Sequence, residues 1–201
     1  MNIVIESIGI LNFFCLICMV TIGLPHGAFD GVIASAMARG GSRFFLFKFI
    51  IIYIGISCFV VFIWILFPAL SLISFLTISI LHFGLGDSSE AGGLKKWFQV
   101  ISHGGIIVVV ISQFHKTEVD ALFSYLVEGR TEVVWAVVNF YSAIILASTL
   151  VYVFCILKDR KDIYKLLELI LLTILLLTLP PLLGFSIYFC LVHSPRHFYS
   201  V

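Results

Sequence analysis

Apolar segments long enough to cross a lipid bilayer follow one another along almost the whole chain. A helix needs about 20 apolar residues to cross the hydrocarbon core. A chain that is 61% hydrophobic and 11% charged also has too little polar surface for a water-soluble particle. We therefore expect an all-α, polytopic membrane bundle of about six to seven transmembrane helices, in one domain over residues 1–201. The expected spans lie approximately at 7–24, 44–67, 69–86, 97–114, 133–157, 166–181 and 182–198.

Two features of this pattern leave alternatives open. Pro180 and Pro181 separate the last two segments, either as a tight hairpin or as a kink within one long segment. Cys15 and Cys18 form a CxxC, which is a metal or redox motif in other settings. Here it lies inside an apolar run with no second pair, so we interpret both cysteines as packing residues.

The positive charges predict how the chain is oriented in the membrane. Lys and Arg in short loops stay in the cytoplasm, and the opposite side of the predicted topology carries only Lys116 and Arg130. This asymmetry predicts a multi-pass protein of the cell membrane with its N-terminus outside. Trp64, Trp97 and Trp135 fall near span ends, as interfacial aromatic residues do. The basic residues of the predicted cytoplasmic side are Arg39, Arg43, Lys48, Lys95, Lys96, Lys158, Arg160, Lys161, Lys165 and Arg196.

Most of the histidines fall in the cytoplasmic half of this topology, although they are far apart in sequence. Only His115 is expected at the outer surface. One histidine in a membrane helix is often a packing or hydrogen-bonding residue, but polar groups within a membrane are costly and tend to mark function. We interpret the group as a metal site near the inner face. Its candidate residues are His26, His82, His103, His193 and His197.

Acidic residues accompany two of these histidines. Asp30 follows His26 in PHGAFD, and Asp87 follows His82 in HFGLGD. An imidazole that binds a metal normally donates its other N–H to a carboxylate or carbonyl, and Asp30 and Asp87 are candidates for that role. The alternative is that each is a solvated acid just past a helix end. His193 lies four residues before a further histidine, so both share a helix face.

Other functions lack the residues that they need. A net charge of +1 and the absence of a basic tail argue against a nucleic-acid partner. Neither a Ser-His-Asp order, a phosphate-binding glycine loop nor a dinucleotide fingerprint occurs in the sequence.

Three segments together resemble the Brp/Blh family of membrane-embedded β-carotene 15,15'-dioxygenases, which make retinal. They are GLPHGAFD (23–30), LHFGLGD (81–87) and YFCLVHSPRH (188–197), and the similarity runs from the first span to residue 197. Family members usually continue past the last motif with further hydrophobic segments. The resemblance thus implies that this chain lacks the C-terminal helices of the family.

What the resemblance implies is a non-haem iron(II) enzyme with four histidine ligands. Carried over to this sequence, they are His26, His82, His193 and His197. It also implies a carotenoid substrate taken from the membrane lipid, O2 as co-substrate, and a functional link to a rhodopsin. His103, in SHGG, has no ligand role in this carry-over, and we hold it as a partner of the ligands or a channel residue.

Two further classes of function remain as alternatives at this point. Membrane di-iron desaturases and hydroxylases also act on lipids, but they carry more histidines, in HxxxH and HxxHH boxes. A histidine-ligated haem protein, or a membrane scaffold protein for a rhodopsin, would be consistent with the same span pattern.

Overall fold

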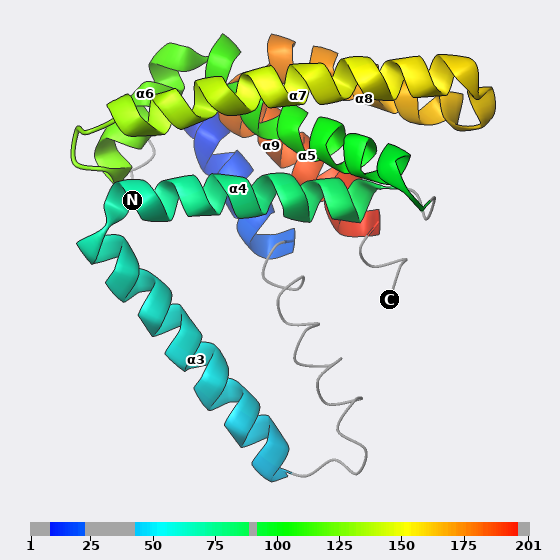
Figure 1. The fold of residues 1–201 in the computed structure, drawn as a ribbon. Coiled ribbons are helices and arrows are strands. Elements are labelled where there is room, and N and C mark those ends of the chain that lie inside the picture. The colour runs from blue at the N-terminus through cyan, green and yellow to red at the C-terminus, as the bar shows by residue number, and fades with distance from the viewer. Residues whose placement is uncertain (1–8, 23–42, 89–91, 197–201) are drawn as a thin grey trace.

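The computed structural model describes residues 9–22, 43–88 and 92–196, and every regular element in these ranges is a helix (Figure 1). The first described helix is Ile10–Ile22. It is followed by α3 (Arg43–Leu66), α4 (Pro68–Asp87), α5 (Leu94–Phe114), α6 (Lys116–Leu126) and α7 (Glu132–Lys158). A 3-10 turn, η1 (Arg160–Asp162), leads into α8 (Ile163–Thr178) and α9 (Pro181–Ile187), and a π-helical segment, η2 (Tyr188–His193), completes the described fold.

The helices confirm the all-α prediction, and the predicted second to fifth spans lie within a few residues of α3, α4, α5 and α7. Four described helices are long and apolar enough to cross a membrane. They are Phe47–Leu66, Pro68–Asp87, Leu94–Phe114 and Glu132–Lys158. The expected total of six to seven spans and the outside N-terminus stay predictions.

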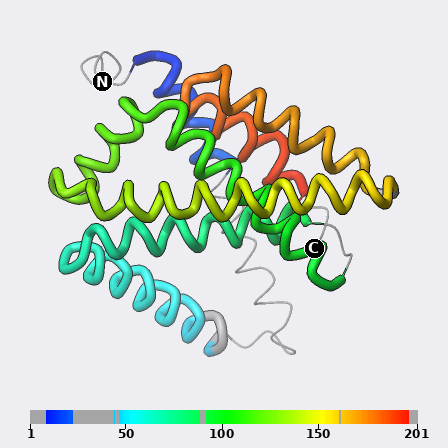
Figure 2. Tube along the Cα trace, turned by 45° about the horizontal axis from the view of Figure 1, so that its top comes forward, coloured from blue at the N-terminus to red at the C-terminus, as the bar shows by residue number. Residues whose placement is uncertain are grey.

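Pro180 and Pro181 form a hairpin rather than a kink. Helix α8 ends at Thr178, and α9 begins at Pro181, where a missing N–H removes no helical hydrogen bond. The chain then runs back along α8, because Arg196 near the end of the hairpin contacts Glu168 in the second turn of α8. The hairpin therefore returns the last motif to the end of the bundle at which α8 began (Figure 2).

Helix α5 lies at the centre of the bundle, and glycines let α4 approach it closely. Of the apolar window of α5, 61% is buried, against 28% for α4, 22% for α7 and none for α3. A Cβ on Gly84 would lie 2.1 Å from the Val100 carbonyl oxygen, and one on Gly104 would lie 1.9 Å from that of Ile80. Small residues at such positions allow the close packing of membrane helices. Helix α3 instead projects away from the bundle (Figure 1).

Polar contacts join the helices at both ends of the bundle. At the end where α4 stops and α5 begins, which we call the site end, Lys95 pairs with Asp162 at 2.7 Å. At the opposite end, the indole N–H of Trp135 donates to Asp120 at 2.6 Å, and that of Trp64 donates to the Leu126 carbonyl at 3.3 Å. These contacts join α5 to the start of α8 at the site end, and α7 to α6 and α3 to the end of α6 at the opposite end.

Helix α6 was not expected from the hydropathy pattern, because its eleven residues are too few and too polar to form a span. It covers the opposite end of the bundle and buries Val119 and Phe123. His115 lies at the junction of α5 and α6, where its Nε2 donates to the Leu176 carbonyl at 2.9 Å. This histidine thus joins α8 to the end of the bundle far from the other histidines.

Candidate metal site

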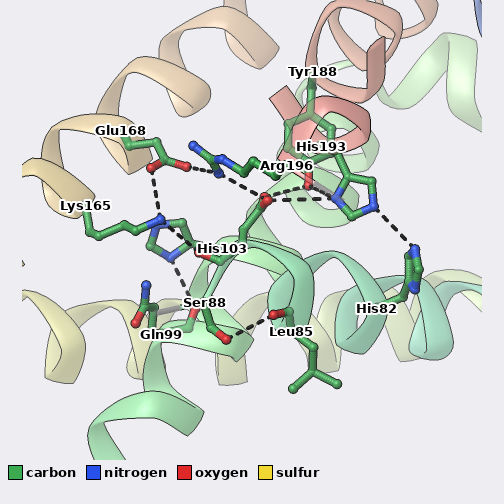
Figure 3. A network of polar contacts seen from close by, with 11 residues as sticks. His82, Leu85, Ser88, Gln99, His103, Lys165, Glu168, Tyr188, His193 and Arg196 are labelled. Atoms are coloured by element: carbon green, nitrogen blue, oxygen red, sulfur yellow. Dashed lines mark hydrogen bonds and ion pairs between the residues drawn. The ribbon is translucent and has the colours of Figure 1, made fainter. Parts of the chain in front are cut away.

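Two of the predicted ligands, His82 and His193, meet at the site end although 111 positions separate them (Figure 3). His82 lies on an exposed face of α4, and His193 is the buried last residue of η2. Their Nε2 atoms are 3.3 Å apart, and the ring centroids are 5.2 Å apart at an interplanar angle of 61°. The same ring nitrogen of each imidazole therefore points at the other histidine.

The local backbone explains how His193 reaches this position. The Ser194 N–H bonds to the Phe189 carbonyl, five residues back, and Pro195 has no N–H with which to continue an α-helical pattern. A turn with i→i+5 bonding brings residues five apart onto one side, so Tyr188 lies beside His193, with ring centroids 5.9 Å apart. Such single π-helical turns occur frequently at functional sites.

Glycine on α4 provides the space for the His193 ring. A Cβ on Gly86 would lie 2.9 Å from Cε1 of His193 and 3.5 Å from its Nδ1. The ring is thus packed directly against the backbone of the helix that carries His82. No larger residue fits at this position without displacement of the imidazole.

The contacts of Tyr188 indicate which nitrogen of His193 carries the proton. Its hydroxyl lies 2.7 Å from Oδ2 of Asp87 and 3.4 Å from Nδ1 of His193. A phenol has one proton, and the short contact to the carboxylate takes it. The tyrosine oxygen can then only accept from Nδ1–H, which leaves the lone pair of Nε2 directed toward His82. Asp87 Oδ1 lies 3.8 Å from the same Nδ1 and adds negative charge on that side.

The pair geometry and the donor set fit a transition-metal ion. Metal–imidazole bonds are about 2.1 Å long, so two of them at roughly 100° place their nitrogens about 3.2 Å apart. The separation of 3.3 Å is close to this value, and without a metal it is the distance of a direct N–H···N contact between the two rings. Neutral imidazoles suit borderline divalent ions such as iron(II) or zinc. Within the described residues, no three His, Cys, Asp or Glu side chains form a group that would hold a metal, so the described part of the site is this pair.

Aromatic rings surround His193. Phe83 contacts it edge-on at a centroid distance of 4.9 Å, and Phe189 stacks on it at 6.0 Å. Phe185 in turn contacts Phe83 at 5.9 Å. On α4, His82 lies among the exposed apolar residues Leu81 and Leu85. These described neighbours of the pair are apolar, whereas Asp87 and Tyr188 provide polar contacts to His193.

The other predicted site residues are distributed differently. His26, Asp30 and His197 lie outside the described residues, so their ligand and partner roles stay predictions. Asp87 faces His193 rather than His82, the histidine that precedes it in sequence. His103 is buried, donates from Nδ1 to the Gln99 carbonyl at 3.2 Å and meets the Tyr152 ring edge-on. It belongs to the interface of α5 with α7, and its role stays a prediction.

Sequence reasoning missed the residues that hold Asp87 and the C-terminal segment in place. Tyr188 gave no signal, because five residues is not a spacing that an α-helix brings together. Lys165 and Arg196 were interpreted only as topology charges, whereas Arg196 Nη1 lies 3.1 Å from Asp87 and also pairs with Glu168. The three-residue spacing of Lys165 and Glu168 was the one available hint of a polar helix face here.

Comparison with known proteins identifies the family. The family model described as "Beta-carotene 15,15'-dioxygenase" matches residues 17–201. A β-carotene 15,15'-dioxygenase from an uncultured marine bacterium, 66A03, is 35% identical over 191 residues, which cover 94% of this chain and 69% of that protein. No solved structure matches the chain. His82, His193 and the residues between them lie within the part matched by the family model, and the chain belongs to the β-carotene 15,15'-dioxygenase family.

Proposed function

We propose that this protein is a non-haem iron(II) dioxygenase that cleaves the central 15,15' double bond of β-carotene with O2 to give two molecules of all-trans-retinal. The observation that carries the proposal is the pair of His82 and His193, with Nε2 atoms 3.3 Å apart, in a chain of this family. Cleavage adds one oxygen atom of O2 to each of the two carbons and leaves two aldehydes. Retinal is the chromophore of rhodopsins, which is the basis for a functional link to one.

In this proposal His26 and His197 complete the ligand set with His82 and His193. Iron(II), when bound, supplies the activation of O2, which no protein side chain provides. The described residues prepare the site for it. Asp87 and Tyr188 favour the tautomer of His193 with its proton on Nδ1, and this directs the lone pair of Nε2 toward His82. The phenylalanine rings around His193 exclude water from that side.

The substrate is a long hydrocarbon that dissolves in membrane lipid, and the surroundings of the pair agree with that source. Four helices suited to cross a membrane support a site within the bilayer. Leu81 and Leu85 on the exposed face of α4 present an apolar approach to His82. We propose that carotenoid enters from the lipid along this face. The basic residues of the site end, such as Lys95 and Lys165, favour a position toward the cytoplasm.

Expression in carotene-accumulating bacteria tests the activity directly. The expected result is loss of the orange colour with formation of retinal, and His82→Ala abolishes both. His115→Ala, at the other end of the bundle, is the matched control and retains both. Apocarotenals of unequal length would contradict central cleavage.

The metal is tested on purified protein. Iron-depleted protein should be inactive and should regain cleavage with ferrous ion but not with zinc. Equal activity with and without metal would refute the iron proposal. A Soret absorption band in the purified protein would instead favour the haem-binding alternative.

A further inference from the structure

Two acidic and two basic side chains form a cluster of ion pairs beside His193 at the site end (Figure 3). They are Asp87, Lys165, Glu168 and Arg196. Asp87 is buried, with 1% of its side chain exposed, and Arg196 Nη1 lies 3.1 Å from its Oδ1. The same nitrogen of Arg196 also pairs with Oε1 of Glu168. Lys165 contacts the other oxygen of Glu168 at 3.4 Å. One guanidinium nitrogen is thus shared between two carboxylates that come from different helices, α4 and α8.

This sharing affects how much negative charge Asp87 presents to His193. A guanidinium that paired with Asp87 alone would offset more of the negative charge of Asp87, since charge-assisted contacts between guanidinium and carboxylate are strong. Glu168 draws part of Arg196 toward α8, and Asp87 keeps a carboxylate oxygen 3.8 Å from Nδ1 of His193. A carboxylate on that side favours Nδ1–H, the tautomer in which the lone pair of Nε2 is directed toward His82.

Glu168 is itself held in place. Lys165 Nζ donates to the Asp87 backbone carbonyl at 3.0 Å, so it joins the start of α8 to the last turn of α4. A cation is favourable there because the last carbonyls of a helix lack intrahelical partners. Lys165 therefore fixes the distance across which Glu168 and Asp87 share Arg196.

We propose that Glu168 is a positioning residue for His193, acting through Arg196 and Asp87 on the tautomer of the imidazole. The proposal deepens the proposed function and rests on His193 being a metal ligand. The simpler reading is that the ion pairs only attach α8 and the C-terminal segment to α4. The two readings differ in what the charge of Glu168 does at His193.

The chain offers a matched control for this distinction. Asp162 pairs with Lys95 at 2.7 Å at the same end of the bundle, apart from the ion pairs that join Glu168, Arg196 and Asp87. Asp162→Asn removes an ion pair of similar exposure and leaves the contacts from Glu168 through Arg196 and Asp87 to His193 in place. Glu168→Gln removes the charge with little change in shape, and Glu168→Asp keeps the charge on a shorter side chain.

The experiment measures Fe(II) and Co(II) affinity of the full purified chain by competition with a chelator, together with the visible spectrum of the Co(II) form. Glu168→Gln is expected to weaken binding by no more than the roughly 10-fold to 100-fold that loss of a ligand's direct partner causes, and to shift the Co(II) bands. Glu168→Asp should recover most of the affinity, and Asp162→Asn should leave affinity and spectrum unchanged. Unchanged affinity in Glu168→Gln, or an equal loss in Asp162→Asn, would overturn the proposal.

A second measurement separates this proposal from the proposed function. In metal-free protein with ¹⁵N-labelled histidine, the ring ¹⁵N NMR shifts report the tautomer of His193, assigned with a His193→Asn variant. Glu168→Gln is expected to reduce the Nδ1–H population of His193. An unchanged population would overturn the proposal that Glu168 acts on the tautomer of His193. If wild-type protein binds neither metal, the iron proposal fails, and the NMR result still decides whether Glu168 acts on His193.

Discussion

The substitution Gly86→Ala tests whether the space beside His193 serves the metal or the fold. The added Cβ would lie 2.9 Å from Cε1 of His193. Ordinary contact begins at 3.4 Å, so the ring must retreat by about 0.5 Å. Distances in metal sites tolerate deviations of only about 0.2 Å. A retreat of this size therefore disturbs the alignment of His193 with His82.

The same change has the opposite effect on the helix. Alanine is favoured over glycine within helices by roughly 0.5–1 kcal/mol, so α4 itself should not be weakened. We expect Fe(II) affinity to fall by about 10-fold or more, the range found when the support of a ligand is lost. The melting temperature should stay the same or rise. Affinity and stability thus move in different directions, which general damage to the fold would not produce.

The assay is anaerobic Fe(II) titration against a chelator, with thermal unfolding recorded on the same samples. Gly55→Ala in α3 is the control for helix propensity alone, since no described atom outside the local helix backbone lies within 4 Å of its added Cβ. Gly84→Ala is the opposite control, because its Cβ would meet a backbone carbonyl at 2.1 Å and force α4 from α5. The reasoning is refuted if Gly86→Ala binds Fe(II) as wild type does, or if it unfolds as early as Gly84→Ala.

Three further substitutions follow from contacts described above. Gly104→Ala would place a Cβ 1.9 Å from the Ile80 carbonyl oxygen, and we expect loss of folded protein in size-exclusion chromatography; a normal yield and elution volume would contradict this packing. His115→Ala removes a hydrogen bond to the Leu176 carbonyl, which should cost about 1 kcal/mol of stability with no change in metal affinity. Tyr188→Phe removes the hydroxyl between Asp87 and the imidazole, and metal affinity should fall by about 10-fold while the fold is kept; an unchanged affinity would argue against the tautomer assignment.

Hydropathy and charge were sufficient to predict that His82 and His193 lie at one end of the bundle, because they determine the depth of each residue in its span. They could not predict direct contact, which depends on how the hairpin after Thr178 packs on α4. The π-helical turn was also beyond the sequence, although Pro195 indicated a disturbed helix. His26 and His197 lie outside the described residues, and the four-histidine set stays a prediction from the family resemblance.

Charged residues show a second limit of the sequence. Arg196 and Lys165 satisfied the topology rule, and that rule gave no reason to look for another role. Their contacts with Asp87 and Glu168 depend on helix ends that are distant in sequence. Helix α6 was not predicted either, because hydropathy alone does not distinguish a short amphipathic helix from a polar connection.

The glycine contact between α4 and α5 holds the backbone at His82 more rigidly than the backbone at His193. His82 lies between Ile80 and Gly84, the stretch of α4 whose backbone touches α5, so its Cα cannot shift unless two helices move together. His193 is attached through side-chain contacts on a single irregular turn. If the pair binds an ion as we propose, an ion of larger or smaller radius would be accommodated by displacement of His193 rather than of His82, and selection among divalent ions would depend on how firmly the packing around His193 resists that displacement.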